Sequence, residues 1–267
     1  MSGGPLALVD AHAHLHACFP VEESLDAAVE HFRGVAAGAD HRGVLMLAEP
    51  AGPEAFAALR AGGWSRWTLE PAADERTRCA RRDDDDARVW LVAGFQVPTA
   101  EGLEVLCLGC ERRPADGDPV ERVVRAARDA GGVAVVPWGA GKWLGRRGVV
   151  LSRLLESLDD PGFFLGDNGG RPAAWRPRHF ADAARRGVRV LAGSDPLPFA
   201  SECRRLGATG FRLRGLDAAA GGARELVARL MEPSTSPEPF GTAERPLRFL
   251  RNQLAMQWRL RASRGAR

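Results

Sequence analysis

The alternation of short apolar runs with amphipathic segments is the feature that most restricts the fold of this chain. The runs suit strands, and the intervening segments repeat apolar residues at helical spacing. This alternation is typical of an α/β domain built on parallel strands, and 267 residues are enough for one large domain. The expected strands are 6–9, 43–48, 88–97, 103–108, 133–136, 163–165, 188–191 and 210–213, and the expected helices are 21–37, 53–61, 120–130, 149–158, 177–186, 198–206, 223–231 and 246–260.

The first expected strand leads directly into Asp10-Ala-His12-Ala-His14. Residues two apart in an extended chain face the same side, so the two imidazoles should project together from the carboxyl end of the strand. Two neutral imidazoles on one face are suited to bind a transition metal. The alternative is a polar strand end whose histidines are solvated.

Polar residues also follow the later strands. A closed (β/α) barrel would gather them at one mouth, where such folds place their chemistry. We therefore expect a distorted, TIM-like (β/α) barrel. No glycine-rich turn follows the first strand, which argues against a dinucleotide-binding fold. The polar residues after the strands are Glu49, Gln96, Trp138, Lys142, Asp167, Asn168 and Asp195.

Asp195 lies on the small-residue turn Gly193-Ser-Asp195, after a late strand. Barrel closure would bring this carboxylate to His12 and His14. Two imidazoles and one carboxylate can hold Zn²⁺, Mn²⁺ or Fe²⁺ and leave room for a water, whose pKa the ion lowers. Glu49 is a possible fourth ligand. The alternative is that Asp195 caps the helix expected from Pro198.

Lys142 is the only lysine of the chain and follows a strand through a Gly-Ala-Gly turn. Glycines let a ligand approach the backbone closely, and Trp138 and Trp143 could wall a pocket beside it. We expect Lys142 to bind an anionic group of the substrate or to stabilise charge in the transition state. The other expected substrate-binding residues are Gln96, Trp138, Arg147, Asp167, Asn168 and Arg171. The alternative is that the arginines are ordinary surface residues.

Three segments together resemble the PHP (polymerase and histidinol phosphatase) superfamily and, more distantly, the amidohydrolases. They are the Asp10–His14 motif, residues 94–109 with their hairpin, and Gly193-Ser-Asp195. The resemblance implies a distorted barrel of about seven strands and metal-dependent phosphoester hydrolysis. The sequence also departs from the family pattern: Glu49, Gln96, Trp138 and Leu197 stand where the family carries metal ligands. A full metal cluster is therefore not expected, and the site should hold one divalent ion or none.

We expect a barrel domain at 1–231 and a linker with a C-terminal helix at 232–267, packed on the barrel. The net charge of +3 gives no reason to expect a nucleic-acid partner. Five scattered cysteines, with no signal peptide and no long apolar span, predict a cytoplasmic protein without a membrane partner. The expected function is metal-dependent hydrolysis of a small anionic substrate, such as a phosphoester. Two alternatives stay open: a metal-free barrel that binds a small ligand or regulates, and a C–N hydrolase of the amidohydrolase type.

Overall fold

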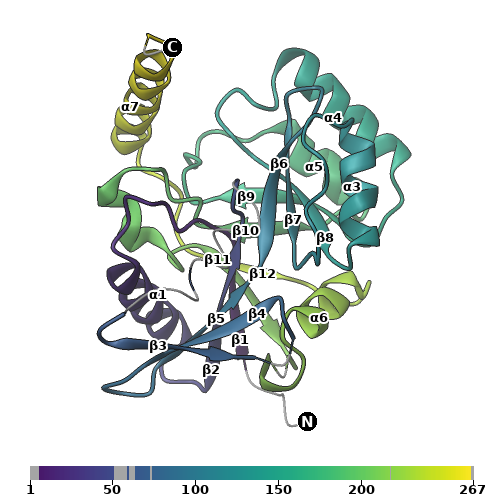
Figure 1. Cartoon of the computed structure of the whole chain (residues 1–267). Coiled ribbons are helices and arrows are strands. Elements are labelled where there is room, and N and C mark those ends of the chain that lie inside the picture. Colours follow the sequence, from purple (N-terminus) through teal and green to yellow (C-terminus); the bar gives the residue numbers. More distant parts are fainter. Residues whose placement is uncertain (1–5, 51–58, 60–63, 73, 217, 266–267) are drawn as a thin grey trace.

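The computed structural model describes residues 6–50, 59, 64–72, 74–216 and 218–265. Its helices lie around two β-sheets (Figure 1). No helix among the described residues is long and apolar enough to span a bilayer. The helices are α1 (Val21–Ala36), α3 (Val120–Asp129), α4 (Gly145–Ser157), α5 (Arg178–Arg185), α6 (Ala218–Met231) and α7 (Pro246–Gly265), with a 3₁₀ helix, η2, at Ala200–Arg205.

Within the described residues, the first sheet has seven strands in the order β12-β11-β1-β2-β5-β4-β3. β1, β2 and β5 are parallel neighbours. On one flank β11 runs antiparallel to β1 and β12 antiparallel to β11, and on the other β4 runs antiparallel to β5 and β3 antiparallel to β4. The strands are β1 (Leu6–Ala13), β2 (His41–Leu47), β3 (Trp67–Pro71), β4 (Thr77–Arg82), β5 (Arg88–Val92), β11 (Gly210–Arg214) and β12 (Glu238–Phe240).

The second sheet has five described strands in the order β10-β9-β8-β7-β6. β8, β9 and β10 are parallel, and β6 and β7 form an antiparallel hairpin beside them. The strands are β6 (Gly94–Pro98), β7 (Glu104–Leu108), β8 (Val133–Pro137), β9 (Phe163–Asn168) and β10 (Val190–Gly193).

The expected TIM-like barrel is wrong, because these two mixed sheets do not close on each other. A barrel needs its last parallel strand to form a ladder with the first. Here β11 pairs antiparallel with the free edge of β1, from Leu6 opposite Arg214 to Val9 opposite Phe211. That edge is therefore unavailable to β10, which pairs only with β9 among the described strands.

Alternating residues along the strands divide the core into layers, as the two-residue period of a strand requires. In β1, Ala7 and Val9 face the core between the sheets, while Leu8 faces the core under α1. In β7, Leu106 faces the core between the sheets, and Val105 faces the core under α3, α4 and α5. Figure 1 shows α1 against the first sheet and α3, α4 and α5 around the second.

Several local expectations also need correction. The single strand expected at 88–97 breaks at Ala93. The Ala93 N–H donates to the backbone carbonyl of Arg76, and the Ala93 carbonyl accepts the backbone N–H of Gly109. The break sends β5 to one sheet and β6 to the other. β3 and β4 lie where no strand was expected, between the strands expected at 43–48 and 88–97. The helix expected at 198–206 is only the 3₁₀ helix η2, and the expected linker contains β12. The helix expected at 53–61 lies almost entirely outside the described residues.

The sheets meet where the carboxyl ends of β1 and β10 converge. The Asp195 N–H donates to the His12 carbonyl at 2.8 Å. Gly193 packs so tightly that an added Cβ would lie 2.4 Å from the backbone nitrogen of His12. On the other side, Glu49 forms a single parallel bridge with Phe95 at the start of the β6 hairpin.

Asp10 holds this junction together. Its fully buried carboxylate accepts backbone N–H groups from His12 at 3.1 Å, Ser194 at 2.8 Å and Gly207 at 3.0 Å. The donors come from the end of β1, the turn after β10 and the turn before β11. One side chain therefore fixes three segments that are far apart in the sequence.

Replacing Asp10 tests this assignment. Asp10→Ala leaves three buried N–H groups without an acceptor, and each such group costs about 1–3 kcal/mol. We expect the free energy of unfolding, measured by urea denaturation, to fall by about 3 kcal/mol or more. Asp40→Ala, at an exposed position, is the control and should change it little. Equal stability of the two variants would contradict the role of Asp10.

Candidate metal centre

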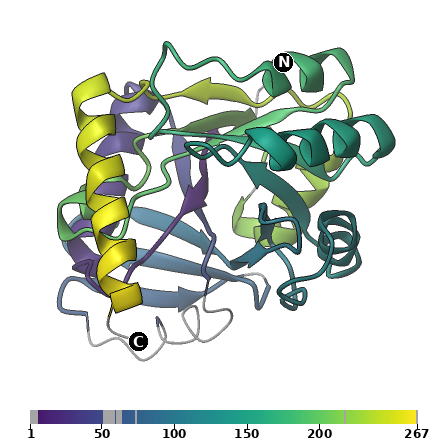
Figure 2. The ribbon, with the colours of Figure 1, turned by 90° about the horizontal axis from the view of Figure 1, so that it is seen from above.

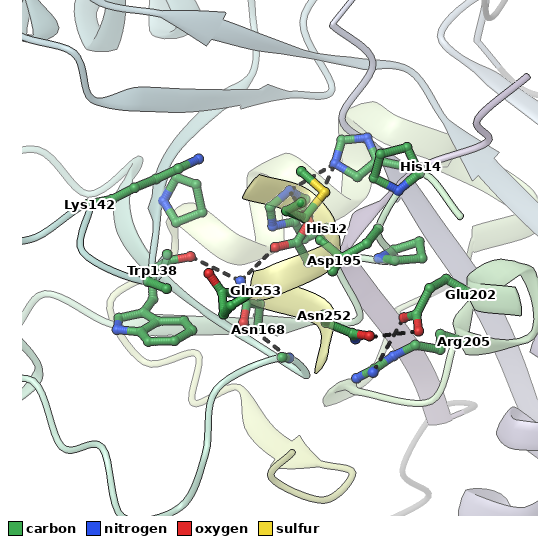
Figure 3. Close-up of a pocket in the computed structure, with 18 of the residues that line it drawn as sticks. His12, His14, Trp138, Lys142, Asn168, Asp195, Glu202, Arg205, Asn252 and Gln253 are labelled. Atoms are coloured by element: carbon green, nitrogen blue, oxygen red, sulfur yellow. Dashed lines mark hydrogen bonds and ion pairs between the residues drawn. The ribbon is translucent and has the colours of Figure 1, made fainter. Parts of the chain in front are cut away.

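His12, His14 and Asp195 lie together at the junction of the sheets, as the sequence predicts. β1 carries both histidines to its carboxyl end, and the turn after β10 carries the aspartate. Both imidazoles are buried, and their ring centroids are 4.9 Å apart. Figure 3 shows the three side chains facing one another.

Three ligand atoms of this group form a small triangle. The two Nε2 atoms are 3.1 Å apart, and Asp195 Oδ1 lies 3.4 Å from that of His12 and 3.7 Å from that of His14. Ligands bound at about 2.1 Å around a tetrahedral Zn²⁺ are separated by about 3.4 Å. The triangle therefore has the size that one transition-metal ion requires, and its residue types are those of a two-histidine, one-carboxylate site.

The charge states also suit ligands. Burial, followed by the closeness of His12, lowers the pKa of His14 to about 3, so the His14 imidazole is neutral at physiological pH. Burial alone would raise the pKa of Asp195, but His12, His14 and Lys142 lower it overall, so this residue is a carboxylate. Neutral imidazole and ionised carboxylate are the forms that bind metals.

Neighbouring groups fix the orientation of Asp195 and His14. The Asn168 amide donates to Asp195 Oδ2 at 2.6 Å and to the Trp138 carbonyl at 2.9 Å, which leaves Oδ1 to face the histidines. Asp195 has φ of 44°, an uncommon left-handed conformation for a residue other than glycine. The His14 ring is stacked on His16, and its buried Nδ1 has no hydrogen-bond partner among the described residues.

A cavity of about 360 Å³ opens in front of the triangle (Figure 3). Trp138 and Asn168 line it, as do Gln96 and Lys142, so these four expected residues do lie at the site. The ammonium of Lys142 is not free, because it forms a close ion pair with Glu104. The same carboxylate oxygen accepts the Gln96 amide at 2.6 Å.

Four expected residues lie outside the described lining of this cavity. Glu49 is buried and accepts the Leu15 N–H at 3.0 Å, but it is not part of the triangle. Asp167 and Arg171 form a two-pronged ion pair with each other, at 2.6 and 2.7 Å. Arg147 donates to the carbonyls of Gly102 and Gly141, so it fastens two loops instead.

The contribution of α7 to the site was not predicted from the sequence. This helix runs along one edge of the molecule (Figure 2), and its Asn252, Gln253 and Gln257 line the cavity. Its Arg248 forms an ion pair with Glu202 at 2.9 Å, and Glu244, just before the helix begins, pairs with Arg205. The apolar face of α7 points outward, and the side chains of Leu247, Leu250, Leu254 and Trp258 are 83%, 56%, 69% and 80% exposed.

The only sequence signal for this role of α7 is its amide side chains. Amides are ordinary on a solvated helix. Only the fold reveals that they line the same cavity as the histidines and Asp195.

Comparison with known proteins identifies the fold. No family model matches the chain, and no curated protein sequence matches it. The crystal structure of PsfC from Pseudomonas syringae PB-5123 is similar, with a TM-score of 0.56 and 16% identity over 96% of this chain and 99% of that one. A second similar structure is Endonuclease Q in complex with a 27-mer duplex substrate that has an abasic lesion at the active site. Its TM-score is 0.50 at 12% identity, and the match covers 90% of this chain but only 60% of that one.

Glu49 provides a pH-dependent test of the site's surroundings. Burial raises its pKa to about 7 from the ordinary 4.5. The folded chain therefore holds this proton more tightly than the unfolded chain. The stability that the protonated group contributes is full below pH 4.5 and is lost as the pH rises through about 7.

Glu49→Gln does not titrate and retains an oxygen to accept the Leu15 N–H. Relative to the wild type, the variant should gain on the order of 2–3 kcal/mol of unfolding free energy as the pH rises across this window. Urea denaturation in the presence of a chelator measures the difference. Glu30→Gln, at an exposed position, is the control. A pH-independent difference for Glu49→Gln would show that the folded carboxyl titrates normally.

Proposed function

We propose that this chain is a metal-dependent hydrolase of a small phosphoester and that His12, His14 and Asp195 hold one Zn²⁺, Mn²⁺ or Fe²⁺ ion. The triangle of ligand atoms carries the proposal, because its edges of 3.1, 3.4 and 3.7 Å and its charge states suit one divalent ion. An ion bound there supplies hydroxide near neutral pH and a Lewis acid for a phosphoryl oxygen.

The residues around the triangle prepare it for this chemistry. Asn168 holds Asp195 Oδ2, so that Oδ1 stays directed at the two imidazoles. Burial keeps His14 unprotonated well below neutral pH. A site fixed in this way loses little conformational freedom when it binds an ion or a substrate.

Lys142 is the group that we assign to the substrate's anion. Its ion pair with Glu104 is partly exposed, with 35% and 27% of the two side chains accessible. Partly exposed ion pairs contribute little to stability, so a phosphoryl oxygen can displace the carboxylate at small cost. Arg205, the other cation of the described lining, is held by Glu202 and Glu244.

The size and charge of the cavity favour a small molecule over a nucleic acid. A volume of about 360 Å³ is typical of small-ligand sites. Three glutamates of the lining, Glu104, Glu202 and Glu244, are paired with Lys142, Arg205 and Arg248, so the described lining offers no run of free cations for a phosphate backbone. Endonuclease Q, which has a similar fold, is an endonuclease bound to a duplex substrate according to the name of its structure, and this likeness supports phosphoester chemistry by analogy alone.

The Asp10–His14 motif and Gly193-Ser-Asp195 form the site, and on their resemblance we also propose that the chain is a divergent member of the PHP superfamily. We also propose that the protein is located in the reducing cytoplasm, since all five cysteines are free thiols.

Metal titration tests the centre directly. The purified chain should bind one equivalent of Zn²⁺ or Mn²⁺ in calorimetry, and binding should raise the melting temperature by mass action. His12→Ala and Asp195→Asn should each lose at least about tenfold in affinity. His41→Ala, which removes a histidine outside the triangle, is the matched control. Absence of binding, or equal losses in all three variants, would favour a metal-free ligand-binding protein.

Turnover tests the substrate class. The metal-loaded chain should hydrolyse p-nitrophenyl phosphate or its diester, and a chelator should abolish the activity. Lys142→Met should lower kcat/KM about tenfold, the effect of one charge-assisted contact, with metal affinity unchanged. Arg147→Met, at a residue outside the described cavity lining, should leave kcat/KM unchanged. If the chain cleaved a cyclic amide but neither p-nitrophenyl ester, the metal centre would be supported and the phosphoester assignment would be overturned.

A further inference from the structure

A second cavity, of about 280 Å³, lies next to the metal centre between the loop after β8, the start of α4 and the start of α5. Trp138 and Gly139 line both cavities. Trp143, which the sequence analysis placed beside Lys142, lines the second cavity and is not among the described residues of the first. The two cavities therefore share a wall but differ in the rest of their lining.

Aromatic rings form the walls of the second cavity and hold one another in place. Trp138 packs edge-to-face on Trp175 at 5.5 Å between centroids. Trp143 packs in the same way on His179 at 5.6 Å and on Phe180 at 5.1 Å. Flat, rigid apolar walls of this kind suit a planar apolar group.

One polar atom of a residue that lines this cavity lacks a partner. Trp143 is only 3% exposed, and its indole N–H has no hydrogen-bond acceptor among the described residues. Buried N–H groups are nearly always paired, because an unpaired one has lost its water without compensation. A ligand oxygen bound in the cavity that Trp143 lines would supply the missing acceptor.

The charge around this cavity is positive. Arg178 lines it, is exposed, and has no ion pair or hydrogen bond with another described residue. No aspartate or glutamate is among the described lining residues. Gly145, also in the lining, begins α4, which has no side-chain cap and no acidic residue in its first turn. An uncapped helix N-terminus adds partial positive charge.

We propose that this tryptophan-lined cavity is a second ligand site, separate from the metal centre, that binds a small planar aromatic carboxylate. The aromatic body lies against the tryptophan rings. The carboxylate accepts the Trp143 indole N–H and meets the Arg178 guanidinium. Neither group has another partner in the described structure, so the ligand completes contacts that the chain leaves open.

Phenylacetate is a suitable probe, with phenylacetamide as its uncharged control. In ¹H–¹⁵N spectra of the full chain, each of the seven tryptophans gives one indole N–H signal. Phenylacetate should shift the signals of Trp138, Trp143 and Trp175 saturably and leave those of Trp67 and Trp90 in place. Phenylacetamide should bind at least about fivefold more weakly, since it cannot pair with Arg178.

Matched variants decide the assignment. Trp143→Phe, which keeps a ring but loses the N–H, and Arg178→Gln should each weaken phenylacetate binding at least about fivefold. Arg176→Gln, an exposed arginine outside the described lining, and Lys142→Met, in the metal cavity, should bind as the wild type does. Arg178 is at the surface, so its variant remains informative if Trp143→Phe folds poorly. Unchanged affinity in both test variants, loss of binding in Lys142→Met, or no saturable binding overturns the proposal.

Discussion

The buried carboxylate of Asp10 is the interaction on which the rest of the site depends. Two open sheets have no continuous ladder to hold them together, so their relative position must be fixed by local contacts. Asp10 accepts N–H groups from both sides of the junction, and Gly193 lets the turn after β10 reach the backbone of His12. These contacts bring Asp195 to the histidines. The ligand triangle is thus a consequence of how the sheets are joined.

Local sequence patterns predict the parts of the fold that local interactions decide. The apolar run of β1 and the helical spacing of α1 are both evident, and His12 and His14 share a face because a strand has a two-residue period. Alternation of strands and helices also indicates an α/β protein. It does not determine strand order. The antiparallel pairing of β11 with β1 and the break at Ala93 depend on backbone partners that are distant in the sequence.

The candidate site, too, has parts that the sequence predicts and parts that it does not. The meeting of His12 and His14 with Asp195 was predicted from barrel closure, but in the structure it arises where the carboxyl ends of β1 and β10, strands of two separate sheets, converge. The cations could not be assigned from sequence. Arg171 is paired with Asp167 within its own loop, whereas Lys142 meets Glu104 from a strand 38 residues away. A sequence displays the charges, but only the fold determines which of them neutralise each other.

The position of α7 bears on how proteins of this shape can diverge. This helix contributes one wall of the cavity, yet it provides no strand to either sheet and none of the three ligand atoms of the triangle. Its contacts include the ion pairs of Arg248 with Glu202 and Glu244 and the packing of Phe249 on Trp175. Substitutions at Gln253 or Gln257 therefore alter what the cavity accepts without reaching the junction of the sheets. The α7 wall of the cavity and the three ligand atoms of the triangle lie on separate pieces of chain, so substitutions in one need not disturb the other.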